Sequence, residues 1–187
     1  TVANAGLPTE QLADGVHLIL GAGAASIAFD FGSYSVVMEA PGNERRSAAV
    51  IAETKRLIPG KPIRYVIATH HHFDHIGGLR SYVAAGATIV AHESNRRYFG
   101  RELARPHTLN PSLDAAQKGP LKVKVLPVGD RRVLSGGGQR IELLHMRGNM
   151  HNAGLLVAYL PAQKMLIQAD LWGPSAPGTA PAPVNSY

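Results

Sequence analysis

The stretch that decides the fold is Thr69-His70-His71-His72-Phe73-Asp74-His75-Ile76-Gly77-Gly78, which holds four of the chain's nine histidines. It overlaps the end of Ile63–Thr69, a short segment that is apolar on nearly both faces and is therefore typical of a buried central strand. His70 and His72 are two positions apart, so they project to the same side of an extended segment leaving this strand. A chance histidine cluster would be expected in a polar loop or at a terminus instead.

Asp74 and His75 follow at the turn into a helix predicted over Gly77–Ala85. Neutral imidazole and carboxylate groups are good ligands for zinc and similar metals. Two ligands on one side of the segment and a carboxylate–imidazole pair one step further can serve two adjacent ions. The stretch therefore predicts a metal site at the end of a central strand.

Around this stretch the sequence predicts a mixed α/β domain. Three short strands separated by glycine-containing turns are expected to form an antiparallel meander, and the strand–helix alternation after them indicates parallel crossovers. Five more strands follow a loop rich in Pro, Asn, Ser and Gly. The predicted strands are Val16–Leu20, Ala25–Phe31, Tyr34–Ala40, Ile63–Thr69, Ala87–Ala91, Leu121–Pro127, Arg131–Leu134, Arg140–Met146, Gly154–Leu160 and Lys164–Ala169, and the predicted helices are Asn43–Ile58, Gly77–Ala85 and Glu93–Leu103.

The composition is that of an ordinary globular domain. The chain has 187 residues, enough for one domain, of which 45% are hydrophobic and 17% charged. The absence of cysteine excludes disulfides, thiolate zinc sites, iron–sulfur clusters and a cysteine nucleophile. The longest apolar run, Leu155–Leu160, is far too short to span a bilayer, which takes about 20 residues. We expect a domain over residues 1–172 and a Pro/Ala-rich tail or linker over residues 173–187.

The formal net charge of +6 does not by itself identify an anionic partner. Basic residues come in scattered pairs such as Arg45-Arg46 and Arg131-Arg132, with no block of five like charges and no aromatic-rich RNA-binding motif. This pattern is typical of a solvated surface, so nucleic acid is not an expected partner. The sequence contains neither a Gly-x-Ser-x-Gly elbow nor a Walker phosphate-binding loop.

On these residues the chain resembles the metallo-β-lactamase-fold hydrolase superfamily. The family signature, His-x-His-x-Asp-His after a central strand, is matched by His70, His72, Asp74 and His75.

Two later segments extend the resemblance along most of the chain. The family has a further His after a glycine-containing turn in its second half, and His151 within Gly148–Asn152 fits that position. A bridging Asp then follows the next hairpin, where Asp170 fits, with Ala169 in the place where Gly is common.

The resemblance implies a fold and a metal centre. The fold would be of class α/β (α+β), a four-layer αββα sandwich of the metallo-β-lactamase type that lacks its last strand–helix unit. The ligands that the resemblance implies are His70, His72 and His151 for one ion, Asp74 and His75 for a second ion, and Asp170 as a bridge between them.

Two departures from the family pattern bear on the site. Glu39 stands near the place where the family often has an Asp that braces the site, and it either does that with a longer side chain or is plain surface. The last His that the family supplies to the second metal has no counterpart after Asp170. Either a missing C-terminal segment or a partner chain completes the site, or the second ion is weakly bound or absent.

Two further histidines are near the expected ligands in sequence. His145 ends a predicted strand close to the His151 turn and is a candidate hydrogen-bond partner of a ligand. His71 lies on the opposite side of the extended segment and is expected to be a bystander or to support the ligands from outside.

These residues predict a metal-dependent, β-lactamase-like hydrolase that uses a metal-bound hydroxide on an ester, thioester, lactone or lactam bond of a small-molecule substrate. A metal lowers the pKa of bound water from 15.7 toward about 7. Asp74 would orient the nucleophile and carry its proton to the leaving group. Zinc, as one or two ions, is the expected cofactor, although these ligands also suit iron and manganese. The alternatives are a nuclease or phosphodiesterase on the same fold, and a degenerate, non-catalytic metal-binding module.

Overall fold

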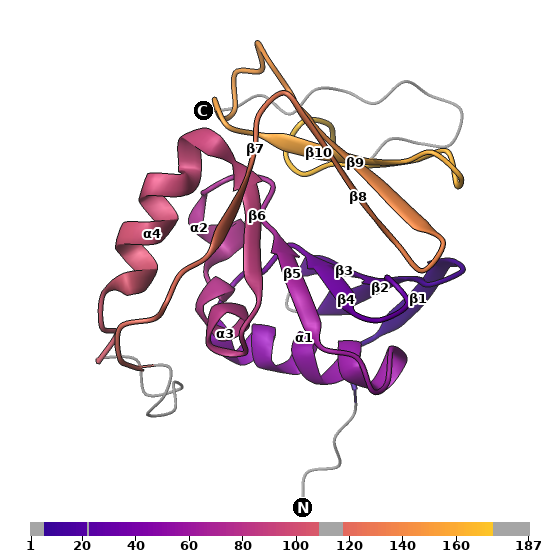
Figure 1. Ribbon diagram of the computed structural model, residues 1–187, viewed down its shortest axis with the longest axis horizontal. Helices are drawn as coiled ribbons and strands as arrows, with labels where there is room; N and C mark the ends of the chain where they lie inside the picture. The colour runs from indigo at the N-terminus through magenta and orange to yellow at the C-terminus, as the bar shows by residue number, and fades with distance from the viewer. Residues whose placement is uncertain (1–5, 22, 109–117, 174–187) are drawn as a thin grey trace, which may run out of the picture.

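Two β-sheets face each other in the structure, a computed structural model that describes residues 6–21, 23–108 and 118–173 (Figure 1). Within these residues the larger sheet has seven strands in the order β1-β2-β3-β4-β5-β6-β7, and the smaller has four in the order β11-β10-β9-β8. The strands are β1 (Thr9–Ala13), β2 (Val16–Gly21), β3 (Ala24–Asp30), β4 (Ser35–Met38), β5 (Ile63–Ile67), β6 (Thr88–His92), β7 (Val125–Val128), β8 (Arg131–Gly136), β9 (Gln139–His145), β10 (Leu156–Leu160) and β11 (Met165–Ile167).

The larger sheet changes from antiparallel to parallel pairing at β4. Strands β1 to β4 form an antiparallel meander, and β4 to β7 pair in parallel. Parallel neighbours need crossover connections, and helices supply those on either side of β5. The helical segments are α1 (Glu44–Leu57), α2 (Phe73–Ile76), α3 (Leu79–Ala84), the 3-10 turn Glu93–Asn95 and α4 (Arg96–Ala104).

Two apolar cores hold the layers together. One core lies between the helices and the larger sheet, where Val50 of α1, Tyr82 of α3 and Phe99 of α4 are buried with residues from one sheet face. The other lies between the two sheets, where Phe29 and Ile141 are fully buried. The described residues thus form a helical layer and two sheet layers of the expected αββα sandwich, and they contain no helix over the outer face of the smaller sheet.

The structure confirms most predicted elements, adds one strand and corrects the bounds of two elements. Strand β1 was not predicted, because its sequence Thr9–Ala13 lies on a largely exposed edge without a clear apolar alternation. The helix predicted over Gly77–Ala85 begins at Leu79, and Phe73–Ile76 forms a separate short helix. The strand predicted over Leu121–Pro127 begins later than expected. Residues 121–124 are not in a regular strand, and β7 begins at Val125. Residues 109–117 and 174–187, and with them most of the expected tail, lie outside the described residues.

The Gly-Gly pair of the histidine-rich stretch lies between the two helices, where the chain passes close to the start of α1. A Cβ on Gly77 would clash with the Gly42 carbonyl oxygen, and one on Gly78 would clash with Ser47 of α1. The two glycines therefore let α2 pack directly against the start of α1. This close approach fixes the helical turn that carries Asp74 and His75.

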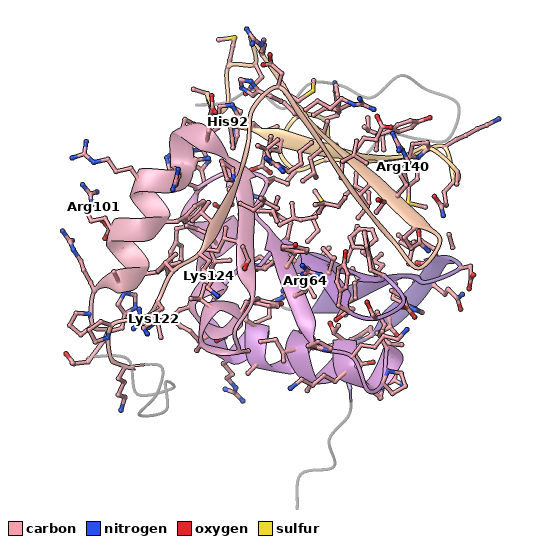
Figure 2. All side chains as sticks on the ribbon, viewed as in Figure 1. Arg64, His92, Arg101, Lys122, Lys124 and Arg140 are labelled. Atoms are coloured by element: carbon pink, nitrogen blue, oxygen red, sulfur yellow. The ribbon has the colours of Figure 1, made fainter. Side chains whose placement is uncertain are left out.

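The positive charge is uneven along the chain. Residues 96–124 contain seven basic and two acidic residues, which give a net charge of +5 out of the chain's +6. Figure 2 shows Arg101 projecting outward from α4, and Lys122 and Lys124 on the segment that leads to β7. The cationic surface therefore lies mainly along α4 and the approach to β7.

Among the described residues, none of the helices has the length and apolar character that a membrane crossing requires.

Candidate metal centre

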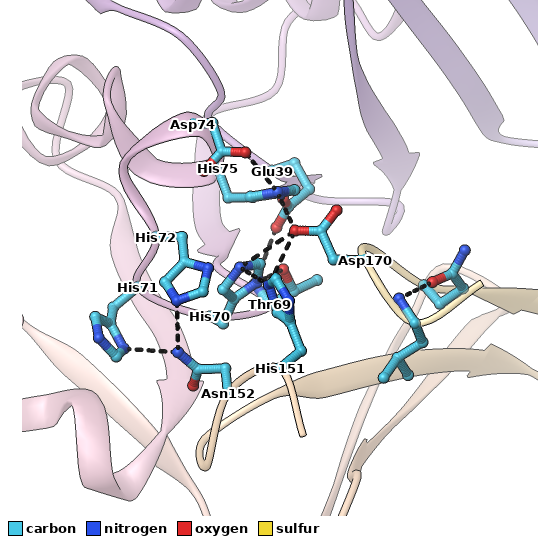
Figure 3. A network of polar contacts seen from close by, with 12 residues as sticks. Glu39, Thr69, His70, His71, His72, Asp74, His75, His151, Asn152 and Asp170 are labelled. Atoms are coloured by element: carbon cyan, nitrogen blue, oxygen red, sulfur yellow. Dashed lines mark hydrogen bonds and ion pairs between the residues drawn. The ribbon is translucent and has the colours of Figure 1, made fainter. Parts of the chain in front are cut away.

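Three segments that are distant in sequence meet beyond the carboxyl end of β5 (Figure 3). The histidine-rich segment continues from β5, His151 lies on the loop between β9 and β10, and Asp170 follows β11. The backbone N–H of Leu156, the first residue of β10, donates to the Thr69 carbonyl oxygen at 2.8 Å. This bond joins the end of β5 to the second sheet and brings the His151 loop close to His70.

Four of the predicted ligands form one group. One ligand atom from each of His70, His72, His151 and Asp170 lies within 4.8 Å of all the others. His151 Nε2 is 3.2 Å from both His70 Nε2 and Asp170 Oδ2. His70 is fully buried, whereas the other three are partly exposed, so the group is partly accessible to solvent.

A second group shares Asp170 with the first. It contains Asp74, His75 and Asp170, again with ligand atoms within 4.8 Å. His75 Nε2 lies 2.7 Å from Asp170 Oδ2 and 3.3 Å from Asp74 Oδ2. The same carboxylate oxygen thus faces both groups, which is the arrangement that a bridging ligand requires.

Neighbouring side chains fix the imidazole rings. Thr69 Oγ1 lies 3.0 Å from His70 Nδ1, so the tautomer with Nδ1 protonated presents the Nε2 lone pair to the group. Asn152 Nδ2 lies 3.4 Å from His72 Nε2 and 3.2 Å from His71 Nδ1. The partners of His70 and His72 therefore come from outside the ligand group and hold the rings in place.

Glu39 is buried beneath the second group. Its side chain is 9% exposed as a residue, its Oε2 lies 2.5 Å from His75 Nδ1, and its Oε1 accepts the backbone N–H of Thr69 at 2.9 Å. These contacts favour the bracing role over the plain-surface alternative. One carboxylate ties the end of β4 to the end of β5 and orients a predicted ligand.

The pKa directions divide the histidines. Burial, reinforced by the surrounding histidines, lowers the pKa of His70 to about 2, which keeps this ring neutral. Burial also opposes the charge on His75, but the hydrogen bond to Glu39 and the nearby carboxylates outweigh it and raise its pKa to about 9. Without metal, a proton on His75 supplies the positive charge that the carboxylates attract.

Backbone strain is found at the same place. Among the described residues, the non-glycine residues with positive φ are Glu39 (70°), Lys164 (50°) and Asp170 (63°). A left-handed backbone in a non-glycine residue costs of order 1 kcal/mol and often occurs at functional sites. Two of the three are the carboxylates on either side of His75, which favours a role for this geometry beyond packing.

His145 and His71 lie outside the ligand groups. His145 Nε2 is 2.8 Å from the Ala153 carbonyl oxygen, and its ring packs at a tilt against that of His92 with centroids 4.0 Å apart. It thus contacts the backbone of the His151 loop and not a ligand side chain. His71 contacts Asn152 and the ring of Tyr98, at a centroid distance of 5.2 Å.

Thr69 and Asn152 contact ligands, and sequence reasoning gave them no role. Each directly adjoins a predicted ligand in the chain, and a hydroxyl or amide beside a ligand histidine is the signal that could have identified them. By contrast, nothing in the sequence pattern could show that their side chains point at the neighbouring rings.

The donor set fits a divalent metal ion. Two acceptor nitrogens, His70 Nε2 and His151 Nε2, face each other at 3.2 Å, an arrangement that a cation between them would stabilise. His151 Nδ1 is buried and has no hydrogen-bond partner among the described residues. Three imidazoles and a carboxylate suit zinc, and also iron or manganese. Within the described residues the second group offers only three ligands, with no further histidine.

A cavity of about 520 Å³ opens beside the second group. Asp74, His75 and Asp170 form one wall, and residues of β3, β4 and the segment after β11 form the others. This volume lies within the range of sites for small molecules.

Comparisons with known proteins agree with this geometry. A family model described as the metallo-beta-lactamase superfamily matches residues 38–183. The 2,4-dinitroanisole O-demethylase subunit alpha of Nocardioides sp. (strain JS1661) is 28% identical over 112 residues, which cover 60% of this chain and 30% of that subunit.

Solved structures are similar over most of the chain. A motif mutant of a metallo-beta-lactamase from Cronobacter sakazakii gives a TM-score of 0.64 at 19% identity, covering 86% of this chain and 62% of that one. A metallo-beta-lactamase from Pontibacter korlensis gives 0.60 at 18% identity, covering 86% and 69%. At these identities the likeness shows the fold alone. The chain spans less than two thirds of the Nocardioides subunit and of the Cronobacter protein.

Proposed function

Because the chain belongs to the metallo-β-lactamase superfamily, we propose that it is a metal-dependent hydrolase that cleaves an ester, thioester, lactone or lactam bond. The observation that carries the proposal is the pair of ligand groups that share Asp170 beside a cavity of about 520 Å³. His70, His72 and His151 would hold one zinc ion, and Asp74 and His75 a second, with Asp170 between them. When bound, the metal would lower the pKa of a water molecule toward about 7 and polarise the bond to be cleaved.

The chain's own residues would then orient the reaction. The Asp74 side chain is 75% exposed and faces the cavity, so its carboxylate can accept a proton from water and pass it to a leaving group. Glu39 binds Nδ1 of His75 and so orients Nε2 of the same ring toward the predicted metal ligands. His70, fully buried and held by Thr69, would remain a neutral ligand throughout.

Metal counting and a hydrolysis panel on the purified chain test this function. We expect one or two zinc ions per chain by elemental analysis, and turnover of at least one ester, thioester, lactone or lactam. 2,4-Dinitroanisole belongs in the panel because the Nocardioides relative is named for its demethylation. His151→Ala should lose metal and activity together, whereas His17→Ala, a histidine of β2 outside both groups, should keep both.

The results also separate the alternatives. One ion without any turnover would indicate a non-catalytic metal-binding module. Hydrolysis of phosphodiesters with affinity that falls steeply as salt rises would indicate a nuclease. The basic charge supports the nuclease only weakly, because it lies mainly on residues 96–124 and not in the cavity beside the ligands.

A further inference from the structure

The walls of the cavity beside Asp74, His75 and Asp170 are mainly small and apolar. They come from the start of β3, the end of β4 with the residues that follow it, and the end of β11 with the segment after it. The apolar side chains in this lining are Ala24, Ala25, Ile27, Met38, Pro41, Ile167 and Ala169, and the polar ones besides the predicted ligands are Ser26, Glu39 and Gln168. The apolar part of this surface offers van der Waals contact and the exclusion of water.

None of the described residues that line the cavity is a lysine or an arginine. The guanidinium of Arg46 lies behind the wall, where its nitrogens donate to Gly21 O, Ala24 O and Ser26 Oγ at 2.9–3.0 Å. Arg46 is 7% exposed, so these donors bind the wall itself. The cations labelled in Figure 2, among them Arg101 and Lys124, lie on other surfaces.

The loops that carry the ligands add exposed apolar side chains. Phe73, which precedes Asp74, is 76% exposed, and Met150, which precedes His151, is 91% exposed. Large apolar side chains are usually shielded from water, and exposed ones beside a site often contact a ligand. Both side chains adjoin predicted ligands in the sequence, although neither is among the residues that line this cavity.

The charges of the centre leave no excess that would attract an anion. Glu39, Asp74 and Asp170 carry three negative charges, which would nearly cancel the four positive charges of two divalent ions if both were bound. A hydroxide held there would cancel the remaining charge. A substrate anion would therefore lose its hydration in an apolar cavity without gaining a cationic partner, which is costly.

We propose that the site selects substrates whose acyl group is uncharged and apolar, and that it discriminates against carboxylate- or phosphate-bearing ones. The inference rests on the proposed function for the reaction, and on the cavity lining for the selectivity. Alanine and isoleucine side chains would contact the acyl chain, and the nearby ligands would hold the bond to be cleaved.

Binding of two amides that resist hydrolysis tests the selectivity apart from catalysis. N-phenylpentanamide and N-phenylsuccinamic acid have acyl chains of similar length, and the second ends in a carboxylate. Calorimetric titration of the zinc-loaded protein should show at least about tenfold tighter binding of the neutral amide. The matching 4-nitrophenyl esters should differ in kcat/KM in the same direction. Equal or tighter binding of the acid, or no binding of either amide, would overturn the proposal.

A charge added to the lining provides a second measurement. Ala25 is exposed and lines the cavity, so Ala25→Lys should improve binding of the acid by about tenfold, the effect of one partly screened charge roughly 6 Å away. Ala104→Lys adds the same charge on the exposed side of α4 and should change neither amide. An equal response to both lysines would show that the lining does not set the selectivity. Neutral preference without turnover of any ester, thioester, lactone or lactam would instead refute the proposed function and leave the binding selectivity intact.

Discussion

Replacing Glu39 by Gln should weaken the second metal site while leaving the first largely intact. The substitution keeps the size of the side chain but removes its charge from the 2.5 Å contact with His75 Nδ1 and from the 2.9 Å contact with Thr69 N–H. A hydrogen bond to a charged group contributes about 1.5–3 kcal/mol, and loss of a partner of a metal ligand typically lowers metal affinity about 10–100-fold. A hundredfold loss corresponds to about 2.7 kcal/mol, so the two estimates agree.

Competitive zinc titration with a chelator of known affinity would measure the effect of this substitution. If the wild-type chain binds two ions, the titration should show two binding steps, and Glu39→Gln should weaken the second step while changing the first by less than about threefold. Glu142→Gln is the matched control, because Glu142 is also ion-paired, to Arg131 and Arg140, but on the hairpin of β8 and β9. Unchanged affinity for both ions in Glu39→Gln would refute the bracing role. An equal loss at both steps would show that Glu39 acts on the fold as a whole.

Three further outcomes follow from the same geometry. His151→Ala removes an imidazole from the first group, so metal affinity should fall by more than the about 10–100-fold typical of losing a supporting residue, and elemental analysis should show loss of metal. Retained metal with full turnover would exclude His151 as a ligand. Asp170→Ala should lower the hydrolysis rate more than His71→Ala, because Asp170 faces both groups; equal effects would contradict a bridging role. The metal-free protein should be most stable near pH 6.5, as measured by urea unfolding. With its pKa lowered to about 2, His70 stays neutral in the folded protein, so stability is lost as the pH falls below 6.5. With its pKa raised to about 9, His75 stabilises the fold below 6.5, and that contribution is lost as the pH rises toward 9. A continued rise in stability from pH 6.5 to pH 8.5 would contradict the assignment for His75, and a fall in stability from pH 5.5 to pH 6.5 would contradict that for His70.

The sequence predicted the site better than it predicted the edges of the fold. His70 and His72 share a side because the chain is extended after a buried strand, and this periodicity can be read directly from the residues. The edge strand β1 carries little such pattern, because one side of it is solvent and its residues are mostly polar. The short helix of residues 73–76 depends on contacts of Gly77 with a distant backbone, which no local pattern records.

The supporting residues were harder to predict because their roles depend on orientation. The sequence alone does not decide between bracing and plain surface for Glu39. Its burial follows from the pairing of β4 with β5, which brings Glu39 to the end of the strand that precedes His70. Asn152 contacts the rings of His71 and His72 only because two sheets dock, which joins positions about 80 residues apart. Such contacts arise from tertiary packing, and spacing in the sequence cannot specify them.

The same docking makes the proposed centre a property of the whole domain. The end of the His151 loop and the start of β10 are attached to parts of the chain that precede β7. Leu156 N–H donates to Thr69 O, and Asn95 Nδ2 donates to Gly154 O at 3.4 Å. Gly154 lies so close to Asn95 and the neighbouring turn that a Cβ there would clash with it. Because these attachments use backbone groups and a glycine contact, His151 can approach His70 only when the two sheets are packed. A metal bound by both histidines would therefore favour the packed state over any partly opened one, and the apolar core between the sheets would in turn hold the ligands in coordinating geometry.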